Sequence, residues 1–177
     1  MDINNPFYID VLSALKSHNV EYILVGGLAV SYHGYSRYTG DMDLWIKPDA
    51  VNMEKLYKTL YDLGYPENII EDIKNNREIE SPTPIKLKDD HDRLKVDLMT
   101  NTFQKEFSWQ ECFDKSEKIS VEDVKIPIVH INQLITMKEN TKRLDNSMKD
   151  LVDAQELRKI QKLKESQRKQ KRRGRRI

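Results

Sequence analysis

The chain has 177 residues, of which 38% are hydrophobic and 33% charged, and its formal net charge is +1. This length suits one compact domain, and no apolar run approaches the length needed to span a bilayer. The N-terminus lacks the basic-then-apolar pattern of a signal peptide, and the single Cys112 cannot form an internal disulfide, so we expect a cytoplasmic protein with no membrane partner.

Hydrophobic spacing predicts alternating helices and strands. Apolar residues from Phe7 to Leu15 predict a helix over 5–18 that stops near Asn19. The next predicted elements are a strand over 22–25, a short helix over 27–34 and a strand over 42–47. A helix follows from Pro48-Asp49 to Gly64, with the apolar stripe Val51, Leu56, Leu60 and Leu63, and then a polar and partly helical segment over 66–82. The last predicted elements are strands over 84–88 and 93–99 that pair antiparallel, a strand over 125–129, a helix from Asn132 and a long final helix from Asp145. We therefore expect an α/β (α+β) fold, with helices on a mixed sheet.

The most informative stretch joins two glycines to two carboxylates. The apolar run Tyr22 to Val25 ends in Gly26-Gly27, and the next strand carries Asp41 and Asp43. Side chains two residues apart in a strand project from one face at about 6–7 Å, so these carboxylates repel each other unless a cation lies between them. Hard divalent ions such as Mg2+ are bound in this way, and glycines let backbone N–H groups approach an anion closely. Each half alone is typical of a turn or of chance, but together they predict a site for a metal and phosphates.

This order of motifs resembles the opening signature of the nucleotidyltransferase superfamily, which has the DNA polymerase β-like fold. The residues that carry the resemblance are Gly26, Gly27, Arg37, Thr39, Asp41 and Asp43. They are most similar to the bacterial Gly-Gly-type branch that includes the AbiEii-like toxins of toxin–antitoxin systems. Aminoglycoside transferases more often have Gly-Ser followed by an arginine, which this chain lacks, and the difference disfavours an antibiotic-resistance function.

The superfamily needs a third carboxylate on a neighbouring strand, and Asp97 occupies such a position. It lies among Val96, Leu98 and Met99, where an ionised side chain is costly unless it is paired or bound to a metal. An ion pair with Lys95 or an edge position is the alternative explanation. The nearby acidic residues Asp89, Asp90 and Asp92 are typical of an exposed hairpin turn.

A lysine and two aspartates near the C-terminus extend the resemblance. The AbiEii-like branch has a helical lysine followed about a dozen residues later by Asp-x-x-Asp, and Lys138, Asp150 and Asp153 have that spacing. The resemblance implies that Lys138 reaches the nucleotide phosphates, as it implies nucleotide binding by Gly26, Gly27, Arg37 and Thr39. Spacing alone favours a structural ion pair for the two aspartates.

The resemblance implies a metal-dependent enzyme that moves a nucleoside monophosphate from an NTP to an acceptor hydroxyl and releases pyrophosphate. Asp41 and Asp43 would hold Mg2+ or Mn2+, and Asp97 would join a second metal or act as a base. RNA, a small molecule and a protein all remain open as acceptors. The alternative is a non-catalytic antitoxin or RNA-binding adaptor on the same fold, but the presence of all three carboxylates favours the enzyme.

The C-terminal segment is strongly basic. Residues Arg158 to Ile177 contain eleven Lys or Arg and one acidic residue, Glu165, which leaves 19 basic and 28 acidic residues before them and a net charge of −9. Such a block cannot bury itself, so we expect a transferase domain over 1–165 and a basic, flexible tail over 166–177. The tail could bind RNA phosphates, lie on the acidic body, or only keep the protein soluble.

Overall fold

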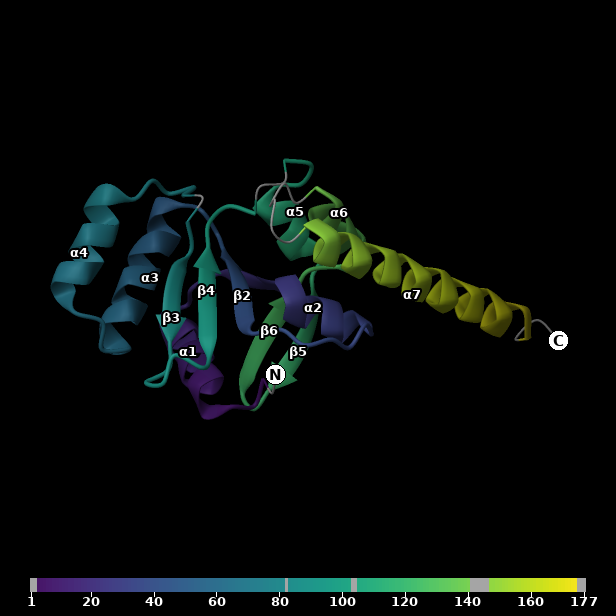
Figure 1. The fold of residues 1–177 in the computed structure, drawn as a ribbon, viewed down its shortest axis with the longest axis horizontal. Helices are drawn as coiled ribbons and strands as arrows, with labels where there is room; N and C mark the ends of the chain where they lie inside the picture. The colour runs from purple at the N-terminus through teal and green to yellow at the C-terminus, as the bar shows by residue number, and fades with distance from the viewer. Residues whose placement is uncertain (1–2, 82, 103–104, 141–146, 175–177) are drawn as a thin grey trace.

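A six-stranded mixed sheet forms the centre of the molecule, with helices packed around it (Figure 1). The computed structural model describes residues 3–81, 83–102, 105–140 and 147–174. The strands are β1 (Tyr22–Val25), β2 (Asp41–Ile46), β3 (Ile85–Lys88), β4 (Lys95–Met99), β5 (Glu117–Val121) and β6 (Val124–Ile128). The helices are α1 (Pro6–Ser17), α2 (Gly26–His33), α3 (Ala50–Asp62), α4 (Glu67–Asn76), α5 (Trp109–Asp114), α6 (Ile131–Glu139) and α7 (Ser147–Gly174). This architecture confirms the predicted fold class.

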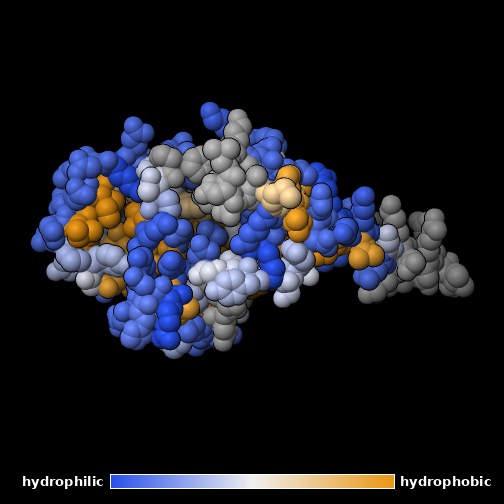
Figure 2. Space-filling model, viewed as in Figure 1, coloured by the Kyte–Doolittle hydropathy of each residue, from blue (hydrophilic) through white to orange (hydrophobic). Residues whose placement is uncertain are grey.

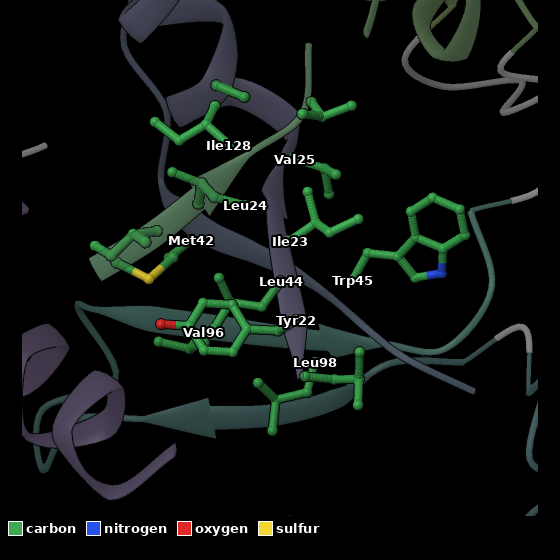
Figure 3. Packing of buried hydrophobic residues seen from close by; sticks show 14 of the residues in the cluster. Tyr22, Ile23, Leu24, Val25, Met42, Leu44, Trp45, Val96, Leu98 and Ile128 are labelled. Atoms are coloured by element: carbon green, nitrogen blue, oxygen red, sulfur yellow. The ribbon is translucent and has the colours of Figure 1, made fainter. Parts of the chain in front are cut away.

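The sheet order is β3-β4-β2-β1-β6-β5, which places β2 between β1 and β4. Strand β2 runs antiparallel to β1 and parallel to β4. Because side chains alternate along a strand, Met42 and Leu44 project to one face and are fully buried, while Asp41, Asp43 and Trp45 project to the other. Figure 3 shows the Trp45 ring and Met42 on opposite sides of the sheet. One face of β2 therefore packs in the hydrophobic core, and the other face carries the candidate site carboxylates.

Helix α1 begins and ends close to the predicted residues. The Asn5 side chain caps it by accepting a hydrogen bond from the Phe7 N–H at 3.1 Å, and Pro6 occupies the first turn, where its missing N–H costs nothing. At the other end, Asn19 has a positive φ of 53°, the left-handed conformation that stops a helix. The buried side chains include Tyr8, Leu12 and Leu15, which join the core under the sheet.

Helix α3 starts as predicted but buries a different stripe. Asp49 is its N-cap and accepts a hydrogen bond from the Asn52 N–H at 2.8 Å. The prediction that Val51 belongs to the buried face was wrong, because Val51 is 70% exposed and Met53 is 3% exposed. Met53 lies three residues before Leu56, which is a helical spacing, whereas Val51 lies five residues before it.

Helix α5 and strand β5 were missing from the sequence prediction. Helix α5 has only six residues, yet its start carries a capping box in which Ser108 and Glu111 exchange hydrogen bonds. Strand β5 forms a hairpin with β6 through a turn in which Glu122 has a φ of 51°. The Ser-x-x-Glu pattern was a usable signal for α5, whereas the mostly polar β5 gave none. The partly helical segment over 66–82 contains α4, and Pro82 lies outside the described residues.

Helix α7 extends far beyond the body of the molecule in Figure 1. Its first half packs on α6 and α2, and Arg158 pairs with Glu139 at 2.7 Å. Lys164 Nζ donates a hydrogen bond to the backbone oxygen of His33 at 3.3 Å, so the basic segment begins on the body of the protein. The helix does not end before residue 166 but continues to Gly174, because Lys, Arg and Gln are good helix formers. Asp145, the predicted first residue, and residues 175–177 lie outside the described residues; the boundary at 166 stays a prediction.

Hydrophilic residues cover most of the face in Figure 2, and hydrophobic residues gather over α3 and α4 and at the start of α7. Among the described residues, no helix is both long and apolar enough to cross a membrane.

Candidate active site

Three carboxylates converge on the open face of the sheet. Asp43 and Asp97 are direct register partners on the parallel strands β2 and β4, and Asp41 lies two residues before Asp43 on the same face. One oxygen from each carboxylate can be chosen so that all three lie within 4.8 Å of one another. Three hard oxygen ligands at this spacing fit a divalent cation such as Mg2+.

The electrostatics of Asp43 support the same interpretation. The pKa of Asp43 is raised to about 7, first by burial and then by the neighbouring charges of Asp41 and Asp97. Lys138 and the backbone N–H of Gly27 oppose this shift. The protein alone therefore disfavours the ionised form of Asp43, which a bound cation would stabilise.

The two glycines form the turn from β1 into α2 beside these carboxylates. Gly26 has a φ of +64°, and a Cβ atom added to it would lie 1.9 Å from Asp43 Oδ2. A Cβ on Gly27 would lie 2.4 Å from Thr39 Oγ1. No side-chain hydrogen bond from the preceding Val25 caps the helix. The N-terminus of α2, where anions are favoured, thus faces the carboxylates with no side chain in between.

Two cations and two carboxylates form a network that links α7 to the site. Arg37 donates two hydrogen bonds to the Asp153 carboxylate, from Nε at 2.6 Å and from Nη2 at 2.7 Å. Lys138 Nζ lies 2.6 Å from Asp150 Oδ1 and 3.1 Å from Asp153 Oδ2. The side chain of Asp153 is fully buried, so its charge depends on these two partners. The expected tie between helices is present, and it also includes Arg37.

A cavity of about 180 Å3 brings these groups together. Of the residues predicted for the site, seven line it: Gly26, Gly27, Arg37, Thr39, Asp41, Asp43 and Lys138. Asp97 joins them through the carboxylate cluster. Sequence reasoning missed Met99, Thr102, Leu134 and Met137, which line the cavity but belong to no recognisable motif.

Other candidate residues lie outside this cavity. Asp89 accepts hydrogen bonds from the backbone N–H groups of Arg93 and Leu94 in the turn between β3 and β4, and the adjacent Asp90 and Asp92 are exposed, as predicted. Cys112 is buried, and this burial raises the pKa of its thiol to about 11, which suits a packed side chain rather than a nucleophile.

Two solved structures are similar to this chain. Among solved structures, the lincosamide antibiotic adenylyltransferase LnuA in its lincomycin-bound form is 18% identical, with a TM-score of 0.50 over 85% of this chain and 94% of that one. An antigenic nucleotidyltransferase-like protein from Paracoccidioides brasiliensis is 14% identical, with a TM-score of 0.43 over 84% and 73% of the two chains. At this identity the likeness to LnuA shows the fold. No curated protein sequence matches the chain.

A family model matches nearly the whole chain. The match covers residues 5–174 and therefore includes the glycines, all three carboxylates and the network of α7. The nucleotidyltransferase superfamily is thereby confirmed, and the narrower resemblance to the AbiEii-like branch stays a prediction. The chain belongs to the family described as "Nucleotidyl transferase of unknown function (DUF2204)".

Proposed function

We propose that this chain is a Mg2+- or Mn2+-dependent enzyme that transfers a nucleoside monophosphate from an NTP to an acceptor hydroxyl. The observation that supports this most directly is the approach of Asp41, Asp43 and Asp97 within 4.8 Å beside the N-terminus of α2. A divalent ion, when bound there, supplies positive charge that neutralises the triphosphate and lowers the pKa of the attacking hydroxyl.

The remaining groups of the cavity suit a triphosphate. The first turn of α2 presents backbone N–H groups and the positive end of the helix dipole, which favour the β- and γ-phosphates near Gly26 and Gly27. Arg37 and Lys138 add two cations to the same cavity. Thr39 Oγ1 lies 3.4 Å from Asp41 Oδ1 and helps to orient that carboxylate.

The reaction is an in-line displacement at the α-phosphorus. The acceptor oxygen forms a bond to phosphorus, the bond to the bridging oxygen of pyrophosphate breaks, and pyrophosphate leaves towards the α2 side. We assign the proton of the acceptor hydroxyl to Asp97, which lies on β4, the strand farther from Gly26. Conversion of this carboxylate to an amide would remove the base.

Two labels on the same NTP test the proposal. The purified protein is incubated with Mg2+, a cell lysate and each NTP in turn, labelled either at the α- or at the γ-phosphate. Nucleotidyl transfer places the α-label in the acceptor and the γ-label in pyrophosphate, whereas phosphoryl transfer places the γ-label in the acceptor. Asp97→Asn is the matched inactive control, with no label expected in any product.

Three outcomes would decide against the proposal: γ-label in the acceptor, equal labelling by Asp97→Asn, or no metal-dependent labelling with any NTP. The last would favour the adaptor alternative. The identity of the labelled species would distinguish RNA, a small molecule and a protein as acceptors. Cytoplasmic location and a place in a toxin–antitoxin pair stay predictions.

A further inference from the structure

A second cavity adjoins the active site. Its volume is about 370 Å3, within the range of small-molecule sites. We call it the Trp45 cavity, and the lining residues that matter here are Trp45, Lys47, Thr100, Thr102, Phe107 and Trp109.

The Trp45 cavity continues the face that carries the carboxylates. Trp45 follows Asp43 by two residues, about 6–7 Å along the strand, and its register partner Met99 follows Asp97 by two. Met99 lines the active-site cavity, and Thr102 lines both cavities. A molecule in the Trp45 cavity could therefore extend a group to the carboxylate cluster.

The lining combines aromatic rings with polar atoms that have no partner. Trp45 Nε1, Thr100 Oγ1 and Thr102 Oγ1 are buried and make no hydrogen bond within the described residues. Trp45 as a whole is only 5% exposed and Thr100 only 2% exposed. Buried polar atoms are nearly always hydrogen-bonded, so these three atoms have unused hydrogen-bonding capacity, which a ligand in the Trp45 cavity engages when the side chains that cover them move aside. Trp109 is stacked on Phe113 at 4.7 Å between ring centroids, and its Nε1 donates to the Trp45 backbone oxygen at 3.0 Å, which fixes the wall.

The direction of the reaction indicates which substrate enters here. Gly26 directly follows β1, and Asp97 lies on β4. Strand β2, which carries Asp43, lies between β1 and β4. In an in-line displacement, the attacking and leaving oxygens lie on opposite sides of the phosphorus. Pyrophosphate leaves towards Gly26, so the acceptor arrives from the side of Asp97, and residues 100–102, which directly follow β4, line the Trp45 cavity.

We propose that the Trp45 cavity is the acceptor subsite and holds a hydroxylated ring, from either a free sugar-like molecule or the terminal ribose of an RNA. Such a ring offers an apolar face to aromatic side chains and hydroxyl groups to Trp45 Nε1, Thr100 and Thr102. The hydroxyl that points to the carboxylates attacks the α-phosphorus, and its proton passes to Asp97 as pyrophosphate departs. This inference rests on the proposed function.

The chain contains two tryptophans, and both line this cavity. Intrinsic fluorescence excited at 295 nm therefore reports its occupancy without any turnover. The probes are a panel of methyl glycosides, a ten-nucleotide RNA with a free terminal ribose, and the same RNA with a 2′,3′-dideoxy end, each titrated with Mg2+ present. We expect a saturable change with either a glycoside or the free-ended RNA, and none with the dideoxy RNA.

Thr100→Val is the test variant, because it removes an unpartnered hydroxyl at nearly constant volume. We expect it to weaken binding of the active probe about tenfold, the usual loss for one hydrogen bond. Thr59→Val is the matched control, since Thr59 is equally buried and donates to the Lys55 backbone oxygen far from the cavity; it should leave probe affinity unchanged.

Binding of a probe with no labelling activity would refute the proposed function, and with it the acceptor role of the cavity, while a ligand site in the Trp45 cavity would remain. Labelling activity with no fluorescence response to any probe would overturn the subsite alone. A response to NTP, with no response to a glycoside or free-ended RNA, would assign the cavity to the nucleotide base and also overturn the inference. Equal losses of probe affinity in Thr100→Val and Thr59→Val would also overturn the inference.

Discussion

Gly26 and Asp43 lie so close that no side chain fits between them: a Cβ atom on Gly26 would approach Asp43 Oδ2 to 1.9 Å. Gly26 also has a φ of +64°, which costs an L-residue about 1–2 kcal/mol. This contact brings the N-terminus of α2 against the carboxylates. The glycine of the motif is thus required by both conformation and space.

Gly26→Ala should therefore remove Mg2+ binding and nucleotidyl transfer, because Asp43 must move out of the cluster. Calorimetric titration with Mg2+ measures the first effect and α-label transfer the second. Gly64→Ala is the matched control: Gly64 has a φ of +84° but no atom within 4 Å of an added Cβ. It should lose stability by the same conformational cost and keep metal binding. Equal metal affinities in the two variants would refute the role of the contact.

Asp43→Asn should stabilise the metal-free protein at pH 8 by up to about 4 kcal/mol, since each unit of pKa shift corresponds to 1.36 kcal/mol. The pKa of Asp43 is raised to about 7 from 3.8, mainly by burial. The folded state therefore binds this proton more tightly than the unfolded state does. The contribution of this carboxyl group to the free energy of unfolding is fully present below pH 3.8 and is lost as the pH rises to about 7. Urea unfolding at several pH values, with metal chelated, measures this slope.

The same experiment carries its own controls. Asp90→Asn, which alters an exposed carboxylate in the turn between β3 and β4, should change neither stability nor its pH dependence. Added Mg2+ should stabilise the wild type and have no effect on Asp43→Asn, because a ligand stabilises only the state that binds it. The prediction would be contradicted if the stabilities of the wild type and of Asp43→Asn changed by the same amount between pH 4 and pH 7.

The sequence predicted the carboxylate cluster well because strand geometry leaves few choices. A period of two places Asp41 and Asp43 on one face, and parallel pairing in register then brings Asp97 beside Asp43. Two glycines between a strand and a short helix similarly predict one arrangement, the tight turn that Gly26 and Gly27 form between β1 and α2. The order of these motifs therefore predicted both the fold and the grouping of the three carboxylates.

The partner of Arg37 could not be predicted in this way. Arg37 and Asp153 are separated by 116 residues, and only the packing of α7 on α2 and α6 brings them together. The Trp45 cavity was equally hidden, because Trp45 resembles an ordinary core residue of a strand and α5 was not recognised. Side chains that meet through tertiary packing leave no local periodicity to read.

Asp153→Asn should destabilise the protein by about 3–5 kcal/mol, the usual cost of breaking a buried ion pair. It should also raise the KM for NTP more than the KM for the acceptor, since Arg37 and Lys138 lose the carboxylate that orients them. Urea unfolding and steady-state transfer assays measure the two effects. The control is Asp123→Asn, which breaks an exposed pair with Lys16 and should cost less than about 1 kcal/mol. Equal costs for the two variants would show that the buried network contributes no more than a surface pair.

Deletion of residues 166–177 should weaken binding of RNA if RNA is the acceptor. The deletion removes seven of the eleven cationic residues that follow position 157. Contact with four to six phosphates gives a log–log dependence of affinity on salt of roughly −3 to −5, and the shortened chain should show a flatter slope. NTP and Mg2+ binding should persist, because the described site residues end at Asp153.

A second variant separates charge from length. Replacement of the seven Lys and Arg residues over 168–176 by Gln keeps the helix-forming residues and should reproduce the deletion, because counterion release depends on charge. Filter binding of a short RNA at several salt concentrations measures each slope. If both variants bind RNA as tightly as the full chain at every salt concentration, the basic segment does not hold the acceptor. If RNA binding becomes stronger on deletion, the segment covers the surface that binds RNA and does not hold the RNA itself.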